Sequence, residues 1–497
     1  MRWSLLPVLA AGACAGAAPV KRHAGVPRPV AAPVCSAERR PGVAVYASPR
    51  GTAVGPGTRD APWDLRTALA CADEGDTVWL RAGVYSGLFA TALRGTATAP
   101  IVFRQYPGER ATIDGTLRAD GAYLVFWGFE IMQSAPSTYG LQANTSFGRF
   151  INLVIHDAGD QGISFWTPGE DAELYGCIVY NNGTHENLDH GVYVHNVIGT
   201  KHITGNVFFD NYARGIQVYA SHNNELVRNV RIEGNISFNN GSISTRVGAR
   251  QNLVVNAQVP ISGMVVRGNL LYFSPGEDGV HMRVGNVDPS FNGDIVVDSN
   301  FAVGGASGLE MRLQWARADV RYNTFVGSPA TIMVTTGGNV AGYQWADNTY
   351  YRDSSAAAWR HNEADDDFAS WRRATGLGES DRVIAGAPPV PKVIVQPNKY
   401  EDGRAFIAVY NFALQRAVDV DLSAVLKHGS RFTIRNVQDV FGEPVLSGTY
   451  VGGMVAIPMN GAEPPVPMGR PTRPAPKTGP GFDVFLVTST SGETSVK

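Results

Sequence analysis

Residues 187–196, NLDHGVYVHN, place an aspartate, two histidines and a tyrosine around one glycine. In a strand, alternation puts the two valines on one side and Tyr193 and His195 on the other. Carboxylate, imidazole and phenol groups are the side chains that enzymes use to move protons. The stretch therefore predicts a site for acid–base chemistry. Its alternative is a polar turn in which Asp189 and His190 bond to their own backbone.

The setting of this stretch is an internal repeat. Asparagine precedes a short apolar strand at intervals of 23 to 34 residues, with Cys177 filling one slot: Asn152, Asn206, Asn235, Asn269, Asn300, Asn323 and Asn348. Units of this length cannot bury their own apolar side, so stacked units must share an interior. A row of asparagines can hydrogen-bond from unit to unit, and Cys177 is then a small buried thiol. The pattern predicts an all-β parallel solenoid.

The segment GTRDAPWDLRTALACADEGDTVWLRAGVYSG (57–87), followed by APIVFRQYPGERATIDG and the asparagine-marked units, resembles the pectate-lyase-like right-handed parallel β-helix superfamily of secreted bacterial proteins. The resemblance covers roughly residues 43–350, and it implies a helix in PWDLRTALACA that caps the N-terminal end. The resemblance is specific for the fold and much less specific for the activity, because the superfamily includes lyases, glycoside hydrolases, epimerases and adhesins. Many β-helix lyases use Ca²⁺ held by clustered carboxylates with a Lys or Arg base. Calcium is thus the cofactor that the resemblance allows, although no tight aspartate cluster is visible here.

The domain organisation follows from composition. We expect a signal peptide at 1–18, a disordered spacer at 19–41, the β-helix at 42–360, a short helix and linker at 361–391, and a C-terminal β-sandwich at 392–497. The Pro-rich residues 463–480 are expected to form a surface loop. Export places Cys35 and Cys71 in an oxidising compartment, where they are the expected disulfide pair. A net charge of −2 argues against nucleic-acid binding, and no second apolar run is long enough to span a bilayer. The expected protein is a secreted monomer, extracellular or periplasmic, whose partner is an extracellular polysaccharide.

Applying one register to successive units predicts a single outward column on the solenoid. The catalytic candidates in it are Tyr193, His195, His281, Arg283, Asp189 and Glu310. The substrate-binding candidates are Trp166, His190, Arg214, Gln217, Tyr219, Asp278 and Arg312. Aromatic faces cover sugar rings, and arginines pair with uronate groups. The column therefore predicts a groove for an acidic polysaccharide.

Two reactions suit this groove. β-Elimination needs a cation to neutralise the uronate carboxylate (Arg214, Arg283 or Arg312), a base for the C5 proton (His195 or His281) and an acid for the leaving oxygen (Tyr193). Hydrolysis needs two carboxyl groups, about 5–5.5 Å apart for retention or 6.5–9.5 Å for inversion, with Asp189, Glu277, Asp278 and Glu310 as candidates. We favour the lyase over the hydrolase.

Non-catalytic alternatives stay open. The same column can bind a polysaccharide without cleaving it, as an adhesion protein does. Glu310 and Arg312 can equally form an ion pair with Arg283 across neighbouring units. We expect no metal site, since the spacing of the acidic and histidine residues between His156 and Asp189 matches no established ligand pattern.

Overall fold

The structure is a computed structural model that describes residue 35 and residues 40–221, 224, 226–246, 248, 250–285, 288–328, 330–335 and 339–489. The expected signal peptide and nearly all of the expected spacer lie outside these residues. Within them, no helix has both the length and the apolar character to cross a membrane.

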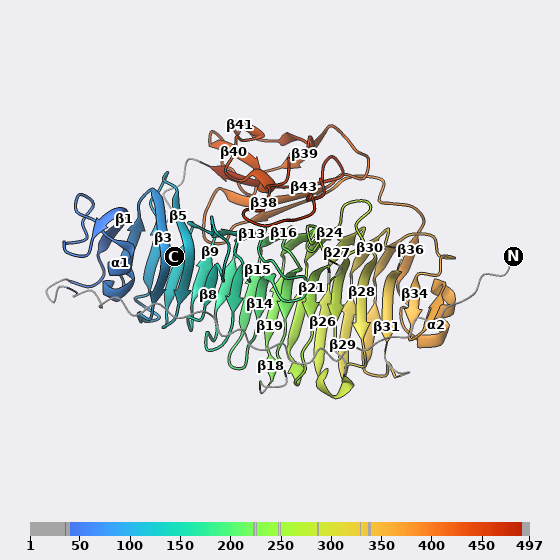
Figure 1. Cartoon of the computed structure of the whole chain (residues 1–497). Helices are drawn as coiled ribbons and strands as arrows, with labels where there is room; N and C mark the ends of the chain where they lie inside the picture. Colours follow the sequence, from blue (N-terminus) through green and yellow to red (C-terminus); the bar gives the residue numbers. More distant parts are fainter. Residues whose placement is uncertain are drawn as a thin grey trace.

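The chain winds into a parallel β-helix whose strands stack in three rows (Figure 1). Row one contains β1 (Ala44–Thr52), β2 (Thr77–Leu80), β4 (Ile101–Gln105), β6 (Leu124–Trp127), β9 (Arg149–Ile151), β12 (Glu173–Tyr175), β15 (Lys201–Thr204), β19 (Val230–Glu233), β23 (Met264–Arg267), β26 (Asp294–Asp298), β29 (Arg317–Arg321) and β32 (Tyr343–Ala346). Row two contains β7 (Glu130–Met132), β10 (Val154–His156), β13 (Ile178–Tyr180), β16 (Val207–Phe209), β20 (Ile236–Phe238), β24 (Leu270–Tyr272), β27 (Phe301–Val303), β30 (Thr324–Val326), β33 (Thr349–Tyr351) and β36 (Arg382–Ile384).

Row three carries the predicted column. It contains β8 (Leu141–Ala143), β11 (Ile163–Phe165), β14 (His190–Val194), β17 (Arg214–Val218), β21 (Gln251–Val255), β25 (Val280–Val284), β28 (Ser307–Arg312), β31 (Ala330–Thr335) and β34 (Trp359–His361). The long strands β3 (Gly83–Thr91) and β5 (Ala111–Ala119) span rows two and three in the first coils. Smaller elements are the pair β18 (Val227–Arg228) and β22 (Ile261–Ser262), the 3₁₀ turn η1 (Pro289–Phe291) and β35 (Ala364–Asp366), antiparallel to β34.

Helices cover the two ends of the β-helix. The predicted capping helix is α1 (Leu65–Cys71), which begins where the Asp64 carboxylate accepts a hydrogen bond from the Thr67 amide. Its last residue forms the predicted disulfide with Cys35. At the other end, α2 (Phe368–Thr375) lies in the expected short-helix segment, and β36 pairs with β33, so the stack runs on to Ile384.

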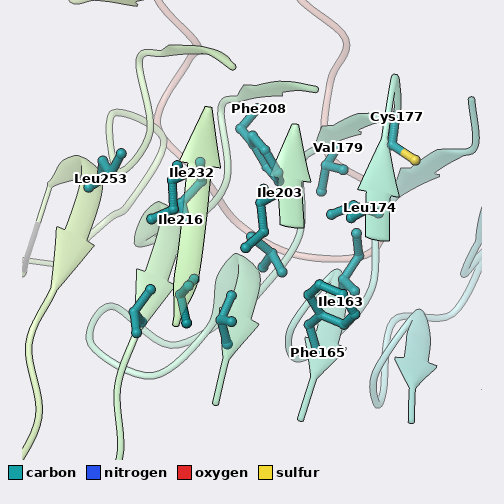
Figure 2. Close-up of a cluster of buried hydrophobic side chains, with 14 of the residues drawn as sticks. Ile163, Phe165, Leu174, Cys177, Val179, Ile203, Phe208, Ile216, Ile232 and Leu253 are labelled. Carbon is teal, nitrogen blue, oxygen red and sulfur yellow. The ribbon is translucent and has the colours of Figure 1, made fainter. Parts of the chain in front are cut away.

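One continuous apolar core fills the solenoid from Val45 to Leu377. Figure 2 shows part of it, where side chains from all three rows point into the same interior. Cys177 is a fully buried free thiol in this core, as predicted, and burial raises its pKa to about 12.

The predicted asparagine ladder is present and runs along the turn after row one. From Asn235 to Asn348, each Oδ1 accepts hydrogen bonds from the backbone and side-chain amides of the preceding asparagine, and the Oδ1 of Asn206 accepts from the Cys177 amide. The ladder ends on Asp381, an acceptor that needs no onward partner. The placement of Asn152 in this row was wrong, because Val154 pairs with Ile178 and so aligns Leu153, not Asn152, with Cys177. Asn152 instead bonds to Asn398 and Glu401 of the C-terminal part.

A second ladder, which the sequence analysis missed, lies at the turn between rows two and three. It links Asn182, Asn211, Asn240 and Asn252 by side-chain hydrogen bonds of 2.9–3.0 Å and ends on His281. These turns precede the strands of row three. The second ladder therefore fixes where the predicted site strands begin.

The C-terminal part contains a five-stranded antiparallel sheet and a two-stranded sheet. The first contains β37 (Lys392–Pro397), β38 (Arg404–Tyr410), β43 (Phe482–Ser489), β40 (Arg431–Asn436) and β41 (Leu446–Thr449), with the 3₁₀ turn η2 (Val437–Asp439); the second contains β39 (Ala417–Asp421) and β42 (Met454–Pro458). The two sheets enclose a shared core, as a small sandwich does. The other face of the larger sheet packs on the outward apolar side chains of row two, among them Phe209, Phe238 and Tyr272.

Candidate functional site

The strand register of row three aligns one outward residue per coil. Gln142, Ser164, Tyr193, Gln217, Val254, Arg283, Glu310, Met333 and Arg360 lie opposite one another in that order. Strand β21, which contributes Val254, was not expected from the sequence. Tyr193 is consequently four strand steps, or about 19 Å, from Glu310 at about 4.8 Å per step. The residues predicted to form a single patch therefore form two clusters, and the apolar Val254 lies between them.

The first cluster is an aromatic surface around Tyr193. The Trp166 ring lies 4.9 Å from that of Tyr193 and 4.6 Å from that of His195, and Tyr219 lies 6.3 Å from Tyr193, centroid to centroid. Trp166, Tyr193 and Tyr219 are half-buried, so each is partly exposed to solvent. Below them, Lys201 is enclosed in the solenoid and donates to the carbonyls of Phe165, at 3.0 Å, and of Trp166, at 2.6 Å.

Arg214 is the cation of this cluster. Its Nε donates to Gln251 Oε1 at 2.7 Å and its Nη1 to the Asn187 carbonyl at 3.0 Å. Within the described part of the chain it has no carboxylate partner. Burial, and then repulsion from Arg283, lowers the pKa of Arg214 to about 10, so the group stays charged at neutral pH. A half-buried cation without a counter-ion attracts an anionic ligand.

Two carboxyl groups meet at the edge of the same cluster. Asp189 Oδ2 accepts from the amides of Thr184 and His185, each at 2.8 Å, so the predicted turn exists. Burial, and next the charge of Asp160, raise the pKa of Asp189 to about 7. Asp189 is therefore both the acceptor that forms the predicted polar turn and a candidate acid–base group.

Tyr139 belongs to this edge and was missed by the sequence analysis. Burial, then Asp160 and Asp189, raise the pKa of its phenol to about 12. The sequence did carry a signal, because Tyr139 immediately precedes the glycine that opens its row-three strand, as Gln161 and His190 do in theirs.

The expectation that His195 and His281 line the groove was wrong. His195 is 3% exposed and its Nε2 donates to the Leu226 carbonyl at 3.0 Å. His281 is fully buried, donates to the Gly304 carbonyl at 3.0 Å and accepts from Asn252. Burial lowers the pKa of both rings, that of His281 to about 4. Neutral, enclosed imidazoles cannot reach a polysaccharide.

His190 is also enclosed, at 2% exposure, but it lies against the aromatic surface. Its ring packs edge-on to Tyr193 with centroids 5.7 Å apart. Burial, then Arg214, holds its pKa well below the usual range, and its Nδ1 has no hydrogen-bond partner among the described residues. Gln217, next in the column after Tyr193, is 5% exposed and likewise has an unpartnered Oε1.

The second cluster is an ion group. Glu310 Oε2 accepts from Arg283 Nε at 2.6 Å and from Arg312 at 3.3 Å, which is the ion-pair alternative. Glu310 and Arg312 line a cavity of about 330 Å³ with Met333, Arg360, Asn362 and Glu363. Asp278 lies in the turn before β25; its exposed carboxylate pairs with Arg250 at 2.5 Å and lines a second cavity next to the C-terminal sheet, and its role in the groove stays a prediction.

The donor groups of the site do not fit calcium. The described residues contain no group of three or more His, Cys, Asp or Glu side chains placed to hold a metal ion. In the first cluster the outward positions carry Tyr193 and Gln217, and one Asp189 oxygen is already saturated by two amides. Ca²⁺ takes six to eight oxygen ligands, mostly carboxylates and carbonyls. We therefore derive no step through a metal.

Comparison with known proteins agrees with this architecture. Residues 45–252 match the family described as "Pel9A-like, right handed beta helix region". Pectate lyase L of Thermoclostridium stercorarium is 33% identical over 128 residues, which are 24% of this chain and 10% of that protein. Pectate disaccharide-lyase of Dickeya chrysanthemi is 26% identical over 218 residues, 41% of this chain and 28% of that protein.

A solved structure, pectate lyase Pel9A, superimposes with a TM-score of 0.52 at 16% identity, covering 62% of this chain and 80% of that one. The matches to the two curated relatives span less than a third of either relative's length. The predicted fold and resemblance are confirmed: the chain is a right-handed parallel β-helix protein with a C-terminal β-sheet region, and residues 45–252 of it are similar to the pectate-lyase-like family.

Proposed function

We propose that the protein cleaves an acidic polysaccharide by β-elimination at the first cluster of row three. The observation that carries the proposal is Arg214, a half-buried guanidinium without a carboxylate partner in the described chain, near the half-buried rings of Tyr193 and Tyr219. A uronate carboxylate placed on Arg214 is neutralised, which acidifies the C5 proton. The tyrosine and tryptophan rings provide the apolar faces on which sugar rings stack.

The proton transfers are assigned to groups at the two sides of this surface. Tyr193 is assigned as the acid for the leaving oxygen, because its phenol is protonated at neutral pH and its side chain points outward in the column. The carboxylates Asp160 and Asp189 replace the histidines as candidates for the base: the raised pKa of Asp189 lets this buried group exchange a proton near neutral pH, and Asp160 is the partly exposed member. The C5 proton passes to one of these carboxylates, the C4–O bond breaks, the C4=C5 double bond forms, and Tyr193 protonates the departing oxygen.

Distance disfavours one of the carboxylate pairs considered for hydrolysis, that of Asp189 with Glu310. Glu310 lies about 19 Å up the column from the Asp189 coil, beyond the 6.5–9.5 Å of an inverting pair. Glycan binding without cleavage remains the competing function. We further propose that the protein is secreted, which the export segment and the Cys35–Cys71 disulfide support.

A substrate panel tests the function. Pectin, alginate, glycosaminoglycans and neutral glycans are incubated with the protein while ultraviolet absorbance of unsaturated uronates and release of reducing ends are recorded. We expect both signals to rise together on a uronate polymer. Reducing ends without absorbance would establish hydrolysis, and binding without either signal would establish a carbohydrate-binding protein.

Variants then test the site. R214M should lower kcat/KM by about 10²–10³, the usual effect of removing one group that stabilises the transition-state charge. Y193F should lower kcat by about 10²–10⁴ through loss of the acid. R267M is the matched control, because Arg267 pairs with Asp298 on row one, away from the groove. Wild-type rates in both R214M and Y193F would refute the assignment.

A further inference from the structure

Two aromatic side chains stack on the surface at the corner between rows three and one, here called the aromatic corner. Tyr123 follows β5 and Phe147 follows β8, and their rings lie 4.6 Å apart, centroid to centroid, at an interplanar angle of 7°. Phe147 is exposed and Tyr123 is half-buried. The Tyr123 amide donates to the Ser146 carbonyl at 2.9 Å, and Ala122 pairs with Ser146, so the two aromatic residues occupy the same place in successive coils.

The backbone at this place is left-handed, with φ of 53° at Tyr123 and 55° at Phe147. Residues with large side chains adopt this conformation at a cost, whereas asparagine and aspartate adopt it more readily. The next coil carries Asp171 at the same place, with φ of 46°. The turn itself therefore does not require aromatic rings, and such costly conformations concentrate where a protein binds a ligand.

The aromatic corner is continuous with the first cluster. Asn144 follows β8 as Trp166 follows β11, and the two strands pair in register, so these two residues are aligned. The Ser146 hydroxyl donates to the Pro168 carbonyl at 3.4 Å. The segment that follows Trp166 therefore lies against the aromatic corner.

Polar groups beside the aromatic corner suit an acidic sugar polymer. The exposed Arg118 side chain lies in the outward column of row three, three strand steps, or about 14 Å, from Tyr193. Its Nε donates to Asp120 Oδ2 at 2.6 Å, and Asn144 Nδ2 donates to Asp120 Oδ1 at 3.0 Å. Because this ion pair uses Nε, the two Nη groups of Arg118 can pair with the carboxylate of a ligand.

We propose that the aromatic corner and Arg118 form a distal subsite for an acidic polysaccharide, in which a sugar ring stacks on Phe147 and a uronate carboxylate binds Arg118. The inference rests on the proposed function and extends it, because it lays the polymer along row three from the first cluster toward the N-terminal coils. Aromatic faces cover sugar rings, and guanidinium groups bind carboxylates in a fixed geometry. The subsite favours long chains, since a short oligosaccharide at Tyr193 does not reach it.

The first experiment measures binding. Dissociation constants of the full chain for polygalacturonate and alginate are determined by affinity gel electrophoresis, in the Y193F background so that little polymer is cleaved. F147N and R118Q should each weaken binding about 5- to 30-fold, the usual effect of truncating an aromatic or arginine contact residue. The matched control is Y322N, because Tyr322 is also an exposed aromatic residue with φ of 55°, in the turn after β29 on row one. Unchanged affinity in F147N or in R118Q, or no binding of either polymer by the parent, overturns the proposal.

The second experiment separates a substrate contact from a structural role. F147Y keeps the ring and should restore binding, and thermal midpoints check that all variants fold. In the active chain, F147N should lower kcat/KM more for polygalacturonate than for trigalacturonate, which is too short to span the distance to the subsite. An equal loss on both substrates, or a loss of binding that F147Y does not restore, shows a structural Phe147 and overturns the proposal. If no uronate polymer is cleaved, the proposed function fails while the binding comparison still decides the subsite.

Discussion

Lys201 offers a test that connects the interior of the solenoid to the groove. Its ammonium group is fully enclosed, donates to the carbonyls of Phe165 and Trp166, and lies 4.4 Å from the centroid of the Phe165 ring. Burial holds its pKa well below the usual value. The perturbation is K201M, which keeps the length and removes the amine.

The expected effect depends on pH, with a defined sign. The unfolded lysine holds its proton up to about pH 10.4. The folded one releases its proton at a lower pH, so between these values the unfolded state binds more protons and wild-type stability rises by about 1.4 kcal/mol per pH unit. At pH 10, K201M should be less stable by about 2 kcal/mol, from two lost hydrogen bonds at about 1 kcal/mol each. The stability deficit of K201M relative to wild type should shrink, and then reverse, as the pH falls toward 7.

The assay is urea unfolding at pH 7, 8, 9 and 10, with K427M as the control at an exposed lysine. Parallel stability curves for wild type and K201M would refute the buried, proton-releasing lysine. Cleavage by K201M should also fall at every pH, because the amine holds the carbonyl of Trp166, whose ring covers His195 and borders Tyr193.

Two further changes test the scaffold. N269A removes four ladder hydrogen bonds of 2.9–3.1 Å and should lower the free energy of unfolding, measured by urea titration, by about 4 kcal/mol. The control is N256A, whose side chain bonds to no other described residue and whose loss should be under about 1 kcal/mol. Equal losses in the two variants would contradict a stabilising role of the ladder. F482A removes the ring that stacks 4.3 Å from Tyr272 at the interface between the C-terminal sheet and row two. It should lower the free energy of unfolding by about 3–5 kcal/mol and speed proteolysis at residues 385–391. An unchanged proteolysis rate would show that other contacts hold the C-terminal sheets in place.

The coil, its interior and one of its ladders could be predicted because they repeat. A side chain that alternates along each strand and an asparagine that returns once per coil are periodic features, and periodicity is visible in a sequence. The same reasoning aligned Tyr193 with Gln217 correctly. This reasoning failed at β21, because the QNLVV strand lacks the opening glycine of its neighbours. The sequence therefore gave no sign that Val254 occupies a position in the column.

Burial of the candidate residues was harder to predict, because alternation gives a side chain's direction but not what lies above it. His195 and His281 point outward from their strands, yet loops that contribute the Leu226 and Gly304 carbonyls cover them. Loop paths have no period, so their course depends on contacts made far along the chain.

The solenoid, the Cys35–Cys71 pair and the candidate face could be predicted from local pattern and composition, and the capping helix from the family resemblance. Which groups of that face lie close together could be seen only in the fold. Three successive turns stack so that Tyr139, Asp160 and Asp189 influence one another, and the Pro-rich segment places Arg470 against Asn181 and Asp157. Proton affinity and charge pairing depend on distance and burial in space, which spacing along the chain does not encode.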